Sequence, residues 1–486
     1  MNNLKHKVLD GLGWSFKAQI FTQAINFIVG ILLMKLLTPD DFGRFAMVFI
    51  VVSFLKNFSN LGLTAAIIQR KNIDEQSLST AFWFQILVAI NITGCLLFFG
   101  HVFNDFYKEE ILNQVSFWLG IDFFIGSFGM IPLALLQKEL NFKVLFKIQL
   151  TAIIISSFIG IFMALSGFSI FSLIGKILTW TTINSLGTYL AIKWRPTFNF
   201  SFQSLSTLLQ FGIPATGNQI LTYLVRNSDD FFIGRVIGST SLGLYNRAYM
   251  LMLLPIGNIS SVIANVLFPS WSKMQNDISK IKRDYIRISG IIALISFPLM
   301  ALLAFLAKPT VLFLFGEEWI KMSTVLSILC IIGMLQSVST LVGLIYKVFD
   351  KNTLLFKIKL IISSLTIIAI IGSVYLYKSI EITALTYGIT SLIALYPSFH
   401  YAGKIINASF IDLVSPIIRP LIISLFTGFI GWMLFNAIPI DIDFIKLFLS
   451  SIFALLTYVF ISKKFNHQVI DDLSTLIKEY NSSRNE

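Results

Sequence analysis

The sequence predicts an all-α integral membrane protein with about 14 transmembrane helices. Its 486 residues are 56% hydrophobic and only 13% charged, whereas soluble domains carry about a quarter charged residues. Apolar runs of about 17 to 25 residues recur along the whole chain, and each is long enough as a helix to cross a hydrocarbon layer of about 30 Å. The alternating segments of about 10 residues that mark a transmembrane barrel are missing. Because backbone groups in lipid must bond internally, we expect these runs to be helices.

The predicted spans form two sets of six and a final pair. The first set covers residues 12–37, 45–66, 81–103, 112–136, 149–167 and 170–192. The second set covers residues 211–237, 245–269, 288–307, 323–346, 357–377 and 381–402, and the final pair covers 418–438 and 444–461. Prolines in or at the ends of spans are expected to act as bending points; they are Pro132, Pro214, Pro255, Pro269 and Pro298.

The positions of the positive charges predict the topology. Most of the 37 Lys and Arg residues fall between spans, on the side that carries the N-terminus. The positive-inside rule places that side in the cytoplasm, so the sequence predicts a multi-pass protein of the bacterial cytoplasmic (inner) membrane with both termini cytoplasmic. Lys5 and Lys7 precede an apolar stretch without a small-residue cleavage site, so we expect the first span to remain in the mature protein.

A shift of 200 positions reveals an internal repeat. It superimposes Gln19 on Gln219, and Phe42-Gly43-Arg44-Phe45 on Leu242-Gly243-Leu244-Tyr245. Six spans per half is an even number, so the two halves are expected to be parallel repeats. The predicted domains are an N-terminal six-helix lobe (1–206), a C-terminal six-helix lobe (207–403), an additional helix pair (404–462) and a cytoplasmic amphipathic tail (463–486).

Span 211–237 carries a polar stripe that is expected to line a cleft. Its members recur at spacings of three and four, which places them on one helix face; they are Gln219, Thr222, Tyr223, Arg226, Asp229 and Asp230. Pairing of Arg226 with Asp229 or Asp230 would lower the cost of holding these charges in a low dielectric. For the uncharged members, interhelical hydrogen bonding is the alternative reading.

Matching polar faces on spans 12–37, 45–66 and 245–269 are expected to meet this stripe at one cavity. Basic residues would make the cavity suit a diphosphate headgroup better than an organic cation. The residues assigned to the substrate cavity are Lys17, Gln19, Gln23, Asn26, Lys56, Asn60, Gln219, Tyr223 and Arg226. Span 245–269 contributes Asn258, Ser261 and Asn265 to the same face.

Three acidic residues are candidates for ion coupling. Asp122 is a lone carboxylate in span 112–136, and Asp229 and Asp230 lie in the polar stripe. An intramembrane carboxylate suggests a proton or sodium site; the alternative for Asp122 is a protonated or hydrogen-bonded packing residue. The sequence contains no nucleotide-binding, zincin or nucleophile-elbow motif, and the histidines and Cys95 and Cys330 lack metal-ligand spacing. No catalytic residue, metal or cofactor is therefore expected.

Several segments resemble a known family. Arg226–Arg235 and Leu242–Pro255 are similar to the phrases D-x-x-x-I-G and L-G-x-Y-x-x-A-Y, and Leu37–Gly43, Leu267–Pro269 and Leu314–Trp319 add further matches. The chain resembles an oligosaccharide flippase of the multidrug/oligosaccharidyl-lipid/polysaccharide exporter superfamily, close to the colanic-acid-exporter type. The resemblance implies two six-helix lobes around a central cavity, a polyprenyl-diphosphate-linked glycan as substrate, and ion-coupled alternating access.

The function expected from the residues and the resemblance together is flipping of lipid-linked oligosaccharide for lipopolysaccharide or exopolysaccharide biosynthesis. A multidrug or cation antiporter of the same superfamily is the first alternative, and it would favour a cavity of carboxylates and aromatics. A glycan polymerase or ligase is the second, and it would need a sizeable outer loop where this chain has short ones. The expected partners are the glycan, membrane lipids and a coupling proton or sodium ion, with polysaccharide polymerase and export machinery as candidates. No nucleic acid is expected, and the chain is expected to act as a monomer.

Overall fold

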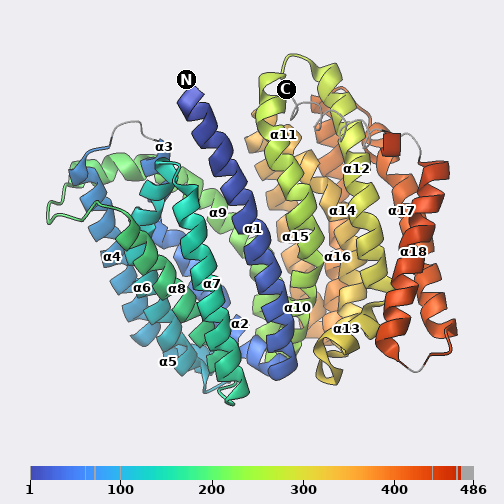
Figure 1. Ribbon diagram of the computed structural model, residues 1–486, viewed down its shortest axis with the longest axis horizontal. Helices are drawn as coiled ribbons and strands as arrows, with labels where there is room; N and C mark the ends of the chain where they lie inside the picture. The colour runs from blue at the N-terminus through green and yellow to red at the C-terminus, as the bar shows by residue number, and fades with distance from the viewer. Residues whose placement is uncertain are drawn as a thin grey trace. The chain divides into compact units, whose positions relative to one another are not determined.

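The computed structural model describes residues 2–60, 62–69, 73–98, 100–440, 442–466 and 469–471. Within these ranges every regular element is a helix (Figure 1). The side chains of Asn60, Gln219 and Asn265 lie outside the described residues, so the predictions that concern them remain predictions.

The fourteen predicted spans each coincide with a long helical segment. In the first half these are α1 (Asn2–Leu36), α2 (Pro39–Asn60), α4 (Glu75–Phe98), α6 (Leu112–Lys138), α7 (Phe142–Leu165), α8 (Phe171–Ala191) and α9 (Phe202–Val236). They continue with α10 (Ser239–Pro255), which is joined to α11 (Ser261–Lys273), and with α12 (Ile278–Phe305), α14 (Met322–Val348), α15 (Asn352–Tyr377), α16 (Ile380–Ile405), α17 (Phe410–Ala437) and α18 (Asp443–Phe465). The predicted fold class is confirmed.

Eleven of the described helical segments are long and apolar enough to cross a membrane. The long helices outside that set are α2, α8 and α9. Two of them, α2 and α9, carry the predicted polar stripes, and α8 contains Lys176.

Short helices and one irregular turn complete the architecture. α3 (Leu63–Gln69), α5 (Gly100–Tyr107), α13 (Ala307–Phe315) and the 3₁₀ turn Glu317–Trp319 lie at span ends, where the sequence predicted no separate elements. The eighth span is interrupted: α10 ends at Pro255, a π-helical turn covers Ile256–Ser260, and α11 follows. A proline at this point removes a backbone donor, so the bend expected at Pro255 coincides with an interruption of the regular α-helix.

The chain divides into two compact units, Met1–Gly243 and Leu244–Glu486. In the first unit, α6 packs against α2, α3, α4, α5, α7 and α8, while α1 lies along α7. α9 packs against α2, α3, α4 and α5, so packing groups it with the six preceding spans. The predicted lobe boundary at residue 206 describes the sequence repeat and stays a prediction.

The second unit is built around α12 and α14. α12 packs against α14 and α17, α14 packs against α16, and α17 pairs with α18. Val469 and Ile470 pack against the buried residues Leu294, Ile423 and Tyr458. These contacts hold the first residues of the predicted tail against the helices of this unit, and residues 472–486 lie outside the described part of the chain.

Candidate functional site

An ion pair joins α2 to α6 inside the first unit. Lys56 Nζ lies 3.0 Å from Asp122 Oδ2. The Asp122 side chain is completely buried, whereas that of Lys56 is 37% exposed. Both residues were predicted functional, one for the substrate cavity and the other for ion coupling, and the structure brings the two together.

Small residues on α6 allow its neighbours to approach closely around Asp122. A Cβ added at Gly129 would meet the Ser185 backbone of α8 at 2.7 Å, and one at Gly126 would touch Thr181 at 3.4 Å. On the α4 side, Gly120 faces Thr93, whose hydroxyl donates to the Gly120 carbonyl at 2.9 Å. Close packing by small residues is the usual way that membrane helices associate. It removes the Asp122 carboxylate from solvent, which explains why that carboxylate needs a cationic partner.

Tyr223 links the polar stripe of α9 to the same helix α2. Its hydroxyl donates a hydrogen bond of 2.6 Å to the Ile50 carbonyl, and its ring lies 6.1 Å from that of Phe54. Ile50 and Phe54 precede Lys56 by less than two helical turns. Tyr223 and Lys56 thus belong to two helices that pack together, as the sequence analysis expected.

The charged members of the α9 stripe differ in their burial. Arg226 is exposed, whereas Asp229 and Asp230 are buried, with 4% and 7% of their surfaces exposed. The expected pairing of Arg226 with one of these carboxylates stays a prediction.

Asp230 lies instead near α5. Burial raises the pKa of the Tyr107 hydroxyl above its ordinary value, and the negative charge of nearby Asp230 adds to the increase while Arg235 opposes it. The Arg235 guanidinium lies 4.9 Å from the ring of Phe106, a distance at which a cation is attracted to an aromatic face. The end of α9 is thus fixed on α5 by aromatic and charged contacts.

The polar residues of α1 lie apart from this group. Lys17, Gln19 and Asn26 are exposed and Gln23 is partly exposed. Lys17 Nζ lies 4.6 Å from the Trp14 ring, which packs against Phe146 of α7. Within the described part of the chain no hydrogen bond or ion pair joins these four residues to α2 or α9. Their assignment to the substrate cavity stays a prediction.

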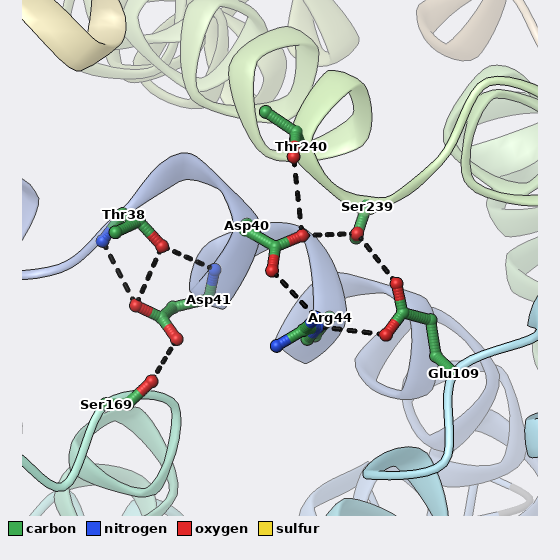
Figure 2. A network of polar contacts seen from close by, with 8 residues as sticks. All are labelled: Thr38, Asp40, Asp41, Arg44, Glu109, Ser169, Ser239 and Thr240. Carbon is green, nitrogen blue, oxygen red and sulfur yellow. Dashed lines mark hydrogen bonds and ion pairs between the residues drawn. The ribbon is translucent and has the colours of Figure 1, made fainter.

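A second polar cluster, absent from the predictions, links helix ends and connecting loops in the first unit (Figure 2). We call it the loop network; it consists of Thr38, Asp40, Asp41, Arg44, Glu109, Ser169, Ser239 and Thr240. Arg44 is its centre, because its guanidinium lies 3.0 Å from both Asp40 and Glu109. Ser239 lies within hydrogen-bond distance of Asp40 and of Glu109, so its single hydroxyl proton serves one carboxylate at a time.

Asp41 attaches a further loop to the network. Its carboxylate accepts from the Thr38 backbone at 3.1 Å, and the Thr38 hydroxyl accepts from the Asp41 backbone at 3.3 Å, which together form a capping box at the start of α2. The other Asp41 oxygen accepts from the Ser169 hydroxyl. The start of α2 is thereby joined to the turn before α8.

Backbone contact between the two repeats accompanies the loop network. A Cβ at Gly43 would overlap the Ser239 carbonyl oxygen, and a Cβ at Gly243 would overlap the Pro39 carbonyl oxygen. Ser239 and Pro39 are themselves 200 positions apart, as are Gly243 and Gly43. The contact is thus reciprocal: each glycine packs against the backbone near the other, at positions that superimpose under the 200-residue shift.

Two signals in the sequence could have located the loop network. Thr38-Pro39-Asp40-Asp41 has the spacing of a capping box with proline at the first helical position, and Gly43 and Gly243 superimpose at the repeat shift. Glu109 and Ser169 gave no such signal, because only the folded chain brings their loops to the start of α2.

Other candidate chemistry is limited. Among the described residues no group of three His, Cys, Asp or Glu side chains could hold a metal ion. In the second unit, the Tyr387 hydroxyl accepts from Gln336 at 2.8 Å and lies 3.2 Å from the Tyr249 hydroxyl. Asn258, predicted to face the cavity, is exposed and donates to the Leu254 carbonyl of its own helix at 2.9 Å.

Comparisons with known proteins give a consistent result. Residues 32–324 match the model of a family described as polysaccharide biosynthesis protein. The chain is 25% identical over 371 residues to the lipopolysaccharide biosynthesis protein WzxC of Escherichia coli (strain K12), covering 76% of this chain and 75% of that protein.

Solved structures with the same fold include transporters of different cargo. An inward closed conformation of the lipid II flippase MurJ matches with a TM-score of 0.69 at 16% identity, covering 94% of this chain and all of that one. An inward-facing multidrug resistance MATE transporter of the MOP superfamily matches with a TM-score of 0.60 at 18% identity, covering 79% of this chain and 94% of that one. A lipid flippase and a drug transporter therefore share this fold, so the fold alone does not distinguish these two functions.

Proposed function

Because this chain belongs to the polysaccharide biosynthesis protein family, we propose that it flips polyprenyl-diphosphate-linked oligosaccharide across the bacterial cytoplasmic membrane. The direction would be from the cytoplasmic to the periplasmic leaflet, in lipopolysaccharide or exopolysaccharide biosynthesis. Both termini would lie in the cytoplasm, where the positive-inside rule places them. Transport would proceed by ion-coupled alternating access.

The observation that carries this proposal is the ion pair on α2 and α6. Lys56 lies near the middle of predicted span 45–66 and remains partly exposed, while the buried carboxylate that balances it is fully enclosed. A charged side chain at this depth is costly and is retained where it serves transport. The exposed side of this ammonium can donate hydrogen bonds to the oxygens of an anionic headgroup, whereas it has no acceptor to offer an organic cation.

The remaining cavity assignments extend the same surface. Tyr223 is bonded to α2, and Arg226 follows it by three residues on α9 with its guanidinium exposed. Arginine forms two parallel hydrogen bonds with a phosphate group. We assign Arg226 and Lys56 to the diphosphate, and the amides of Gln19, Gln23, Asn26, Asn60 and Gln219 to the glycan or to water around it.

The multidrug antiporter is the second candidate, and the MATE-like fold is the observation that favours it. A catalytic role is not part of the proposal, since the family and the structural neighbours are named for biosynthesis proteins, flippases and transporters. We also propose that the chain acts as a monomer, and that polysaccharide polymerase and export proteins are candidate partners.

Export in the native host tests the assignment of Arg226. In a strain that lacks this chain, we expect Arg226→Ala to restore less than a tenth of wild-type cell-surface polysaccharide, since removing a phosphate-binding charge costs about 1.5–3 kcal/mol or more. Arg226→Lys keeps the charge and is expected to retain part of the export. Lys193→Ala, on the exposed segment before α9, serves as the matched control with full export.

The same strain separates the two candidate functions. Accumulation of lipid-linked oligosaccharide on the cytoplasmic leaflet, measured by its protection from a glycan-cleaving enzyme added outside, supports the flippase. Loss of ethidium efflux without such accumulation would establish the antiporter instead. Full polysaccharide export by Arg226→Ala would remove Arg226 from the mechanism.

A further inference from the structure

We propose that Tyr249, Gln336 and Tyr387 form a binding surface for the uncharged sugar rings of the lipid-linked glycan. This inference rests on the proposed function and adds residues of the second unit that contact the glycan itself. The Tyr387 hydroxyl accepts from Gln336 Nε2 at 2.8 Å and lies 3.2 Å from the Tyr249 hydroxyl. We call these three side chains the tyrosine–amide surface; they come from α10, α14 and α16, one from each helix.

Two glycines bring the three helices close enough for these bonds. A Cβ at Gly333 of α14 would meet the Met252 side chain of α10 at 2.7 Å, and a Cβ at Gly388 of α16 would overlap the Ile332 side chain of α14. Each glycine lies within three residues of a member of the tyrosine–amide surface. Close helix packing by small residues therefore fixes where the two hydroxyls and the amide lie.

Tyr387 lies on the side of α16 away from its exposed apolar face. That face consists of Leu385, Ile389, Leu392, Ile393 and Tyr396. Tyr387 is two positions from Leu385 and two from Ile389, which is about 200° around a helix. It is nevertheless partly exposed. Its exposed part thus belongs to a different surface from the one that suits acyl chains.

The exposed stripe of α14 is polar and open beside Gln336. Earlier in the helix this stripe is apolar, with Ile331 45% exposed. From Gln336 onward its members are the partly exposed Ser339 and Thr340, which follow at the helical spacings of three and four. A Cβ at Gly343, one turn further on, would meet nothing within 4 Å. The surface therefore offers hydroxyl groups and room for a ligand next to the amide.

The distribution of charge favours a neutral ligand at this surface. The one charged residue of α14 is Lys347, next to the last position of the helix. On α16 no charged side chain lies between Glu381 and His400. α10 carries Arg247, but Arg247 is two positions from Tyr249 and so about 200° away around the helix. A diphosphate has no cationic partner among the three side chains, and the glycan is the uncharged part of the proposed cargo.

The chemistry of the three side chains matches that of a sugar ring. A sugar ring presents hydroxyl groups at its edge and C–H groups on its faces. Tyrosine combines an apolar ring with a hydroxyl that donates and accepts, and glutamine supplies both a donor and an acceptor. Mostly apolar or aromatic contacts with a few fixed polar groups are typical of small-ligand sites.

Native mass spectrometry of the purified full-length protein tests the proposal with two ligands. One is the lipid-linked oligosaccharide extracted from a host strain that lacks this chain, and the other is undecaprenyl diphosphate, which has no glycan. We expect Gln336→Ala and Tyr387→Ala each to weaken binding of the extracted oligosaccharide about tenfold, and to leave the affinity for undecaprenyl diphosphate within about twofold.

Two further variants serve as references. Tyr375→Ala removes a tyrosine that is 55% exposed on α15 and should bind both ligands as the wild type does. Arg226→Ala should weaken both ligands, because both carry the diphosphate. If Tyr387→Ala does not fold, Tyr387→Phe removes only the hydroxyl and should weaken the extracted oligosaccharide alone, by about threefold.

The remaining outcomes separate this inference from the proposed function. If Gln336→Ala and Tyr387→Ala weaken both ligands equally, or weaken neither, the three side chains are packing residues, and the inference is overturned while the flippase stands. Failure of the wild type to bind either ligand would overturn the proposed function as well. Weaker ethidium binding by Tyr387→Ala would in that case assign the surface to an organic cation, which aromatic faces attract.

Discussion

At the scale of single residues, depth in the membrane drew attention to Lys56 and Asp122 but did not predict that the two form an ion pair. Lys56 and Asp122 were each selected because a charge within a span is costly. Their pairing was not predictable, because they lie 66 positions apart and meet only through the packing of α2 on α6. On α9, the spacing of three and four suggested an ion pair of Arg226 with Asp229 or Asp230, which stays a prediction.

Glycine 43 gives the residue-scale prediction. Any Cβ there would overlap the backbone carbonyl of Ser239, and backbone cannot move aside as a flexible side chain does. We expect Gly43→Ala to destabilise the protein by about 1–3 kcal/mol, as overpacking does. The measurement is the thermal melting of the detergent-solubilised protein.

Glycine 30 provides the matched control for this prediction. A Cβ at Gly30 of α1 meets nothing within 4 Å, and alanine favours a helix over glycine by about 1 kcal/mol. Gly30→Ala should therefore melt at or above the wild-type temperature. Equal melting temperatures for Gly43→Ala and Gly30→Ala would show that the repeats do not need the close contact.

At the scale of helices, the sequence indicates where α2 begins, but it does not indicate which helices pack together. Thr38-x-x-Asp41 marks the start of α2 by the same reciprocal bonding that starts α17, where Ser409 and Asp412 form a second capping box. The attachment of α9 to α2, α3, α4 and α5 depends on long-range packing. No periodicity within α9 indicates which neighbours cover it.

The capping box of α2 predicts non-additive mutations. Thr38→Val and Asp41→Ala should each lower stability by about 1 kcal/mol, because each removes hydrogen bonds made to the other residue. The double variant should cost clearly less than the sum of the two, which thermal melting of all four proteins would reveal. Ser169→Ala isolates the separate bond to Asp41, and strict additivity of Thr38→Val and Asp41→Ala would contradict the reciprocal box.

At the scale of the whole molecule, the order and number of the long helices followed from the sequence. Each apolar run became a long helix, since a chain in lipid has few other ways to bond its backbone. The division into two units at Gly243 could not be predicted from the sequence. It depends on which helices pack together, whereas the sequence repeat indicates only which segments are similar. The loop network was likewise missed, because it gathers residues from separate connections.

Topology gives the prediction at this scale. With both termini cytoplasmic, alkaline phosphatase fused after Gly316 should be active, whereas the same enzyme fused after Glu486 should be inactive, because it folds only outside the cytoplasmic membrane. Green fluorescent protein at the same two points should show the opposite pattern. Phosphatase activity at the C-terminus would invert the proposed orientation and exchange the two leaflets in the proposed direction of transport.

The π-helical turn after Pro255 also changes how the eighth span must be interpreted. A wider turn within an α-helix adds one residue to its path, which rotates everything beyond it by about 100°. Side chains from Ser261 onward therefore point in a different direction from the one that an unbroken helix starting at Ser239 would give them. To decide whether a residue in α10 and another in α11 lie on the same side of this span, the extra residue in the π-helical turn must be taken into account.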